Sequence, residues 1–152
     1  MYRHNSVSTM STTGLAMDEV DILMDEVKQA IKQKVSREVT LKTLIETDQE
    51  LAKARYLSDN EKGAILSMRR VHRFKGTLES VVTCCARLLK LRQDLEAAIA
   101  SCDRGGILEL DLGALQDSFE QALDMHSDTK SPMPPEAELL AQVHKLVGMV
   151  EI

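Results

Sequence analysis

The stretch Val71–Cys102, VHRFKGTLESVVTCCARLLKLRQDLEAAIASC, carries the repeat that decides the fold. Its apolar residues recur in alternating steps of three and four over about four heptads, and Arg92 is the charged residue that interrupts them. A helix with so regular an apolar seam needs a partner helix along its length. The seam consists of Val71, Phe74, Leu78, Val81, Cys85, Leu88, Leu95 and Ile99.

The preceding segment offers that partner, because it also has the pattern of a long helix. Apolar residues recur at helical spacing through residues 20–54, with one polar gap at 36–40. Residues 58–61, SDNE, supply a turn and several candidate N-caps for the second helix. Two helices joined by a short turn are antiparallel neighbours, so we predict an all-α fold built on a long helical hairpin over residues 17–104.

One or two shorter amphipathic helices are expected after the hairpin. Two adjacent glycines end the second helix, and a third helix is predicted over residues 107–126. Residues 127–135 hold all three prolines and are predicted to form a linker. A short C-terminal helix is predicted over residues 136–148. Residues 1–16 are rich in Ser and Thr, which favours a disordered tail.

The composition narrows the class of protein. Apolar residues make up 43% of the chain and aromatic residues 3%, a composition typical of helix-on-helix packing. The net charge of −5 argues against binding of nucleic acid through bulk charge. Bases are nevertheless concentrated in residues 62–92, which hold eight Lys and Arg against one acid, between two acidic flanks. The three cysteines, two of them adjacent, do not form a disulfide framework. We expect them to be small apolar residues of a protein in a reducing compartment.

No catalytic constellation is found in the sequence. It lacks a phosphate-binding glycine loop followed by Lys, a nucleophile elbow and a His-Glu-x-x-His motif. Neither the four histidines nor the three cysteines have the spacing of metal ligands. We therefore expect neither an enzyme nor a bound cofactor or metal.

The middle of the chain resembles a known family. Residues 50–54, ELAKA, precede the polar turn, and residues 62–74, KGAILSMRRVHRF, follow it. An alanine-leucine run, a basic cluster and a Tyr or Phe stand at this place in the ESCRT-III family, the charged multivesicular body proteins. Leu78, Leu95-Glu96 and Ala98 continue the match. The chain resembles a divergent or shortened member, because its first helix starts with acids where the family is basic.

The resemblance implies a cytosolic subunit that is peripheral to endosomal or other membranes. Such a subunit would polymerise with other ESCRT-III-type subunits, coat anionic membrane and act in endosomal sorting, vesicle budding or scission. The bases of the second helix would face acidic lipid, each contributing about 1 kcal/mol, or the acids of a neighbouring subunit. The alternative is that they form a solvated helix face. These bases are Lys62, Arg69, Arg70, Arg73 and Lys75.

The last helix has two possible roles. ESCRT-III proteins commonly end in a short helix that docks into a microtubule-interacting and transport domain, such as that of the AAA-type disassembly ATPase. Glu136, Leu139, Val143 and Leu146 fall at the first, fourth, eighth and eleventh places of that pattern. The same spacing suits a helix that packs on the chain's own hairpin. The resemblance also implies that acidic C-terminal helices fold back on the basic core. The alternative function is a helical adaptor or coiled-coil module with no membrane role.

Overall fold

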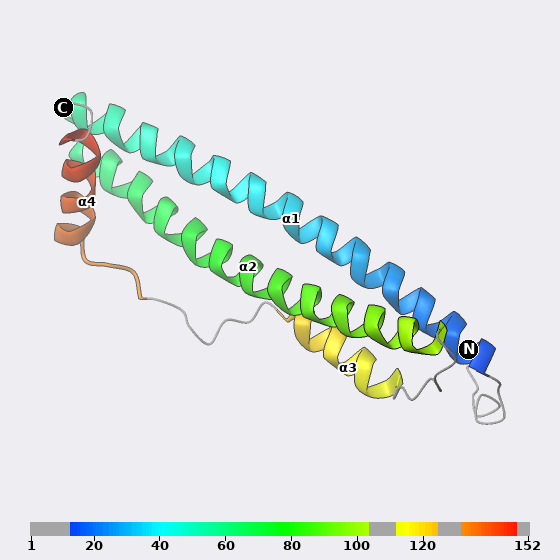
Figure 1. The fold of residues 1–152 in the computed structure, drawn as a ribbon. Coiled ribbons are helices and arrows are strands. Elements are labelled where there is room, and N and C mark those ends of the chain that lie inside the picture. Colours follow the sequence, from blue (N-terminus) through cyan, green and yellow to red (C-terminus); the bar gives the residue numbers. More distant parts are fainter. Residues whose placement is uncertain (1–12, 104–111, 125–131, 149–152) are drawn as a thin grey trace, which may run out of the picture. The chain divides into compact units, whose positions relative to one another are not determined.

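A computed structural model describes residues 13–103, 112–124 and 132–148, and the side chains of 18–101, 112–124 and 132–148. The described residues form four α-helices and no strand (Figure 1). The helices are α1 (Thr13–Leu57), α2 (Glu61–Asp103), α3 (Leu112–Leu123) and α4 (Glu136–Gly148).

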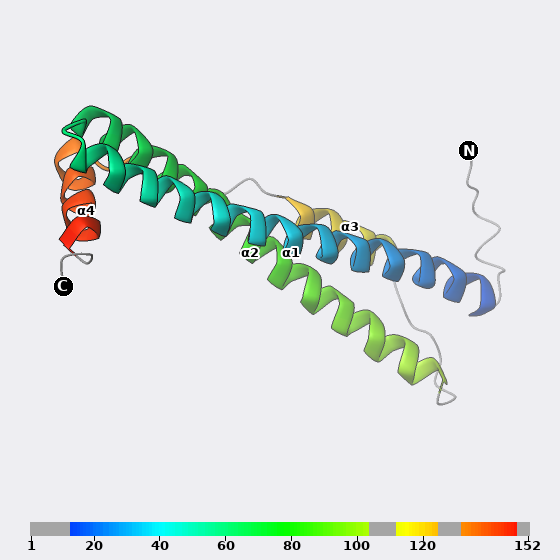
Figure 2. The same cartoon turned by 90° about the horizontal axis from the view of Figure 1, so that it is seen from above.

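The predicted all-α hairpin is confirmed, because α1 and α2 run antiparallel and pack against each other on either side of a short turn (Figure 2). The helix ends differ in detail from the prediction. α1 begins at Thr13, four residues before the predicted start at residue 17, and its first turn contains no acid. Four residues of the predicted tail, 13–16, are therefore helical, and the rest of it lies outside the described residues. α3 ends at Leu123, three residues before its predicted end, and residues 107–111 of its predicted start lie outside the described residues.

The turn between α1 and α2 satisfies the backbone groups at both helix ends. Asp59 adopts a left-handed conformation with φ 59°, and the N–H of Asn60 donates to the carbonyl of Arg55 at 2.8 Å. The N–H of Asp59 donates to the carbonyl of Tyr56 at 3.1 Å, which completes a Schellman motif. The side chain of Asn60 then caps α2 by accepting from the N–H of Gly63 at 2.9 Å.

The chain divides into two compact units, and α1 and α2 each contribute to both. The tip unit contains residues 36–82 and α4, and the base unit contains residues 13–35 and 83–103 and α3. The division on α1 falls at the polar gap noted in the sequence, where no side chain between Ile31 and Leu41 is buried. Each unit therefore has buried residues of its own.

The core of the tip unit is drawn from three helices. A polar contact lies beside it, in which Arg55 Nη1 on α1 donates to Ser67 Oγ on α2 at 3.0 Å. Ser67 is fully buried, so this bond supplies the partner that its hydroxyl needs. The tip core consists of Ile45, Ala52, Ala64, Ile65, Met68, Val71, Leu139, Val143 and Val147.

The predicted seam of α2 lies largely inside the protein. Phe74, Leu78 and Ile99 are half-buried, and the other five seam residues are buried. Arg92 interrupts the seam as expected from the sequence, with its side chain about a third exposed and its Nε 4.0 Å from a carboxylate oxygen of Glu96. The other buried side chains of the base unit are Val20, Leu23, Met24, Val27, Ala30 and Ile31 of α1, Cys84 and Leu91 of α2, and Ala122 of α3.

None of the described helices is both long enough and apolar enough to span a bilayer.

Candidate functional site

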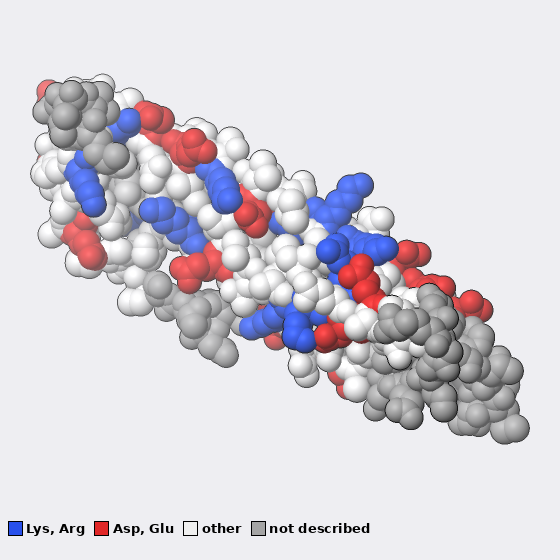
Figure 3. Space-filling model, in the orientation of Figure 1, with Lys and Arg blue, Asp and Glu red and all other residues white. Residues whose placement is uncertain are grey.

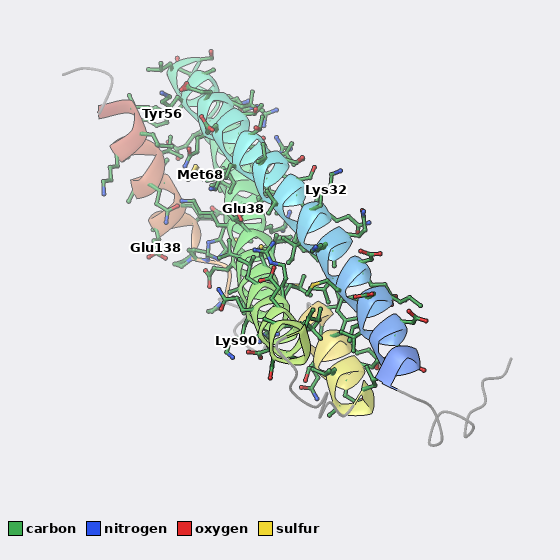
Figure 4. The ribbon with its side chains drawn as sticks, turned by 45° about the vertical axis from the view of Figure 1, so that its right-hand side comes forward. Lys32, Glu38, Tyr56, Met68, Lys90 and Glu138 are labelled. Atoms are coloured by element: carbon green, nitrogen blue, oxygen red, sulfur yellow. The ribbon has the colours of Figure 1, made fainter. Side chains whose placement is uncertain are left out.

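The helix α4 lies against the hairpin tip and completes its core. Leu139, Val143 and Val147 are buried at successive steps of four, so they form one stripe along α4. In Figure 4, Tyr56 and Met68 lie on the part of the hairpin next to α4, and Met68 belongs to the same core as the stripe. The structure thus places α4 on the chain's own hairpin.

The docking pattern expected for the last helix overlaps with this stripe. Leu139 and Val143 are buried in the tip core, Leu146 is half-buried at its edge, and Glu136 is exposed. Val147 was missed, because the docking pattern places a base there, whereas steps of four from Leu139 would have found it. Leu139 and Val143 are inaccessible to a partner domain while α4 stays in this position.

Two polar contacts flank the apolar stripe of α4. Arg69 Nη2 lies 3.0 Å from Glu136 Oε2, and the rings of Tyr56 and His144 meet edge to face with centroids 5.0 Å apart. Both partners of the ion pair are partly exposed, so the pair contributes at most about 1 kcal/mol. The apolar stripe supplies most of the binding free energy of α4, and the polar contacts orient the helix.

The five bases predicted as one surface do not share one face of α2. At about 100° per residue, Lys62, Arg69 and Arg73 fall within an arc of about 40°. Arg70 lies about 60° beyond that arc, and Lys75 lies more than about 100° from it on the other side. The sequence run had suggested a single face because neighbouring bases are close in sequence, whereas neighbours on a helix point in different directions.

Arg70 is paired with an acid of the other hairpin helix. Its Nη2 donates to Asp48 Oδ1 at 2.8 Å, and its Nε donates to both carboxylate oxygens at 3.2 Å. Asp48 on α1 is only 7% exposed, so this bidentate pair ties the two helices of the hairpin together. The hydrogen bonds and charge of Asp48 raise the pKa of Arg70 above its ordinary value. Arg70 therefore stabilises the hairpin rather than contributing to an outer basic surface.

A smaller exposed face remains on α2, which we call the tip face: Lys62, Leu66 and Arg73. Leu66 is 51% exposed and lies one turn from Lys62 and two turns from Arg73 on the same side of the helix. No ion pair joins either base to another side chain in the described part of the chain. Elsewhere bases and acids are mixed, as Figure 3 shows for one side of the molecule.

The base unit has an open hollow of about 520 Å³ between α1 and α2. Met24, Ile99 and Ala100 are its apolar lining residues, and all three are buried or half-buried. Its charged lining residues are three acids and one base, so the hollow carries a net negative charge. We call it the base hollow; its charged residues are Asp21, Asp25, Glu96 and Lys28.

The two cysteines whose side chains the structure describes lie in the interior of the base unit. Cys84 and Cys85 are buried and form no disulfide, and burial raises the pKa of Cys84, which disfavours the reactive thiolate. Cys102 lies outside the described side chains. Among the described residues, no group of three or more His, Cys, Asp or Glu is placed to hold a metal ion.

Comparisons with protein-family models, with curated proteins and with solved structures find no match to this chain.

Proposed function

We propose that this chain is a subunit of an ESCRT-III-like membrane-remodelling assembly, held in a closed form by α4. The observation that carries the proposal is the position of α4, whose apolar stripe covers the hairpin tip and whose Glu136 pairs with Arg69 of the basic segment. A hairpin that assembles with other helices needs an apolar surface to offer them. Here part of that surface is occupied by the chain's own last helix.

Release of α4 would have two consequences. It would expose the tip core to helices of other subunits, and it would free Leu139 and Val143 for a microtubule-interacting and transport domain. Both events use residues that are buried in the closed form, so they depend on the same opening step. The acid-base contact expected of the C-terminal region is supported by Glu136 of α4. Of the acids in the predicted third helix, Glu109 and Asp111 lie outside the described residues.

The test is a variant that opens the subunit without removing any segment. Val143→Asp places a charge in the tip core and should release α4, whereas Ala141→Asp places the same charge on the exposed side of α4. We expect Val143→Asp to raise self-association and co-sedimentation with phosphatidylserine liposomes, in a salt-sensitive way. Ala141→Asp should behave as the unchanged protein does.

The second candidate is a helical adaptor without a membrane role. It is favoured by the pairing of Arg69 and Arg70 within the chain, which leaves fewer bases for lipid headgroups. Absence of liposome binding by both the unchanged protein and Val143→Asp, at low salt and with anionic lipid, would favour the adaptor and overturn the membrane proposal.

A further inference from the structure

The tip face is an exposed apolar residue with a positive charge on either side. Leu66 presents about half of its surface to solvent, and Lys62 and Arg73 flank it along α2. Arg69 on the same side of α2 pairs with Glu136 of α4, yet Leu66 and its two flanking bases stay exposed with α4 in place. The face is therefore available in the closed subunit. Its complement would be an apolar depression with a negatively charged rim.

The base hollow has this complementary chemistry. Met24, Ile99 and Ala100 contribute apolar lining, and Asp21 and Asp25 line it from α1. Glu96 stands on the α2 side, so acids approach from both helices. In the docked pair, a leucine side chain would pack on these apolar lining residues, and the long stems of Lys and Arg would let their charges reach the lining acids. The charges that would meet are opposite in sign.

We propose that the tip face of one copy of this chain docks into the base hollow of a second copy. The proposal rests on the proposed assembly function and names its contact. The two surfaces differ, so the contact is heterologous: each copy uses its tip face on one neighbour and its base hollow on another. Such contacts propagate into an open filament or close into a ring.

A second copy explains the tip face better than a lipid surface does. A helix that lies in a membrane interface presents a broad apolar face beneath its charges. The tip face offers one leucine, and the next outward positions along the helix are charged. That pattern suits a localised pocket with matched charges, and the base hollow is such a pocket.

A charge exchange between two variants tests the contact in solution, without lipid. The first variant is Lys62→Glu with Arg73→Glu, and the second is Asp21→Lys with Asp25→Lys. In each variant alone, both surfaces carry the same sign, so the self-association constant should fall by about tenfold or more. In a mixture, the negative tip face of the first variant meets the positive hollow of the second. The positive tip face of the second variant likewise meets the negative hollow of the first, so association should return. Lys75→Glu, which reverses a base on another side of α2, should leave association unchanged.

Analytical ultracentrifugation over a concentration series at low salt gives the readout. Restored association in the mixture supports the contact, and a mixture that stays as dissociated as its components overturns it. Unchanged protein that remains monomeric throughout the series also overturns it. If Lys62→Glu with Arg73→Glu loses liposome binding but keeps self-association, the tip face is a membrane contact and the inference fails. Charge rescue without any liposome binding would uphold the inference and refute the membrane proposal.

Discussion

The pair formed by Arg70 and Asp48 predicts unequal costs for removing its two partners. Arg70→Ala leaves a carboxylate that is only 7% exposed without its charged partner. Asp48→Ala leaves a guanidinium whose side chain is 44% exposed, which water can reach. The two substitutions remove the same hydrogen bonds, so the difference reports the environment of the group left behind.

The magnitudes follow from these exposures. Loss of one partner from a buried pair costs about 3–5 kcal/mol, and an exposed pair contributes about 0.2–1 kcal/mol. Arg70→Ala should fall toward the first range, about 2–4 kcal/mol, after allowance for the exposed guanidinium that screens the pair. Asp48→Ala should cost about 1–2 kcal/mol, and the two residues should couple in a double-mutant cycle.

Urea denaturation followed by circular dichroism at 222 nm measures both costs, provided that the slope of the transition is unchanged. Lys75→Ala is the matched control, since Lys75 is an exposed base on α2 that forms no ion pair with another described residue. Equal costs for the two partners, or a larger cost for Asp48→Ala, would refute the reasoning. The result also matters for interpreting charge-reversal variants of the basic residues, because reversing Arg70 would weaken the hairpin itself.

Three further outcomes are expected. Leu88→Asp should destabilise the protein by about 3–5 kcal/mol, because it places a charge in the buried seam. The same change at Leu89, which is 37% exposed, should cost under about 1 kcal/mol. Similar melting curves for the two variants would show that the seam is not buried. Gly63→Ala should cost about 1–2 kcal/mol in urea titrations, because its methyl group would collide with the capping side chain of Asn60. Gly76→Ala, with open space around it, should instead gain up to about 1 kcal/mol. Cys84 should react with a maleimide only as the protein unfolds, because its thiol is buried. Its pKa is raised in the folded state, so the free energy of unfolding should fall as pH rises through the range where an unfolded thiol ionises. Rapid labelling of the native protein would contradict both expectations.

Much of the hairpin was predictable because its signals are local or periodic. The heptad seam requires only the spacing of side chains on one helix, and most of its members are indeed buried. The position of the turn was predictable from the sequence, but its backbone conformation was not. Three residues could have capped α2, and Asn60 does so because Asp59 is used for the left-handed end of α1. Which neighbour takes which role depends on backbone geometry that spacing does not encode.

The candidate site was less predictable, because its contacts join residues far apart in the chain. The ion pair of Arg69 and Glu136 spans 67 residues, and nothing in either sequence neighbourhood specifies the other. Asp48 falls on a buried side of α1, where a simple hydrophobic pattern expects an apolar residue. It is tolerated there because Arg70 supplies three hydrogen bonds. A polar residue out of pattern on one helix, facing an arginine on the next, is the signal that could have found this pair.

The position of α4 also has a consequence for the order in which the chain acquires its structure. The hairpin turn closes over three residues and allows α1 and α2 to pair by local contacts, which form quickly. α4 must return across a much longer stretch of chain, so its docking is entropically more costly and comes late. During synthesis from the N-terminus, the hairpin tip is complete before α4 has been made. Every newly made copy therefore passes through a stage in which the apolar surface of the hairpin tip is not yet covered by α4.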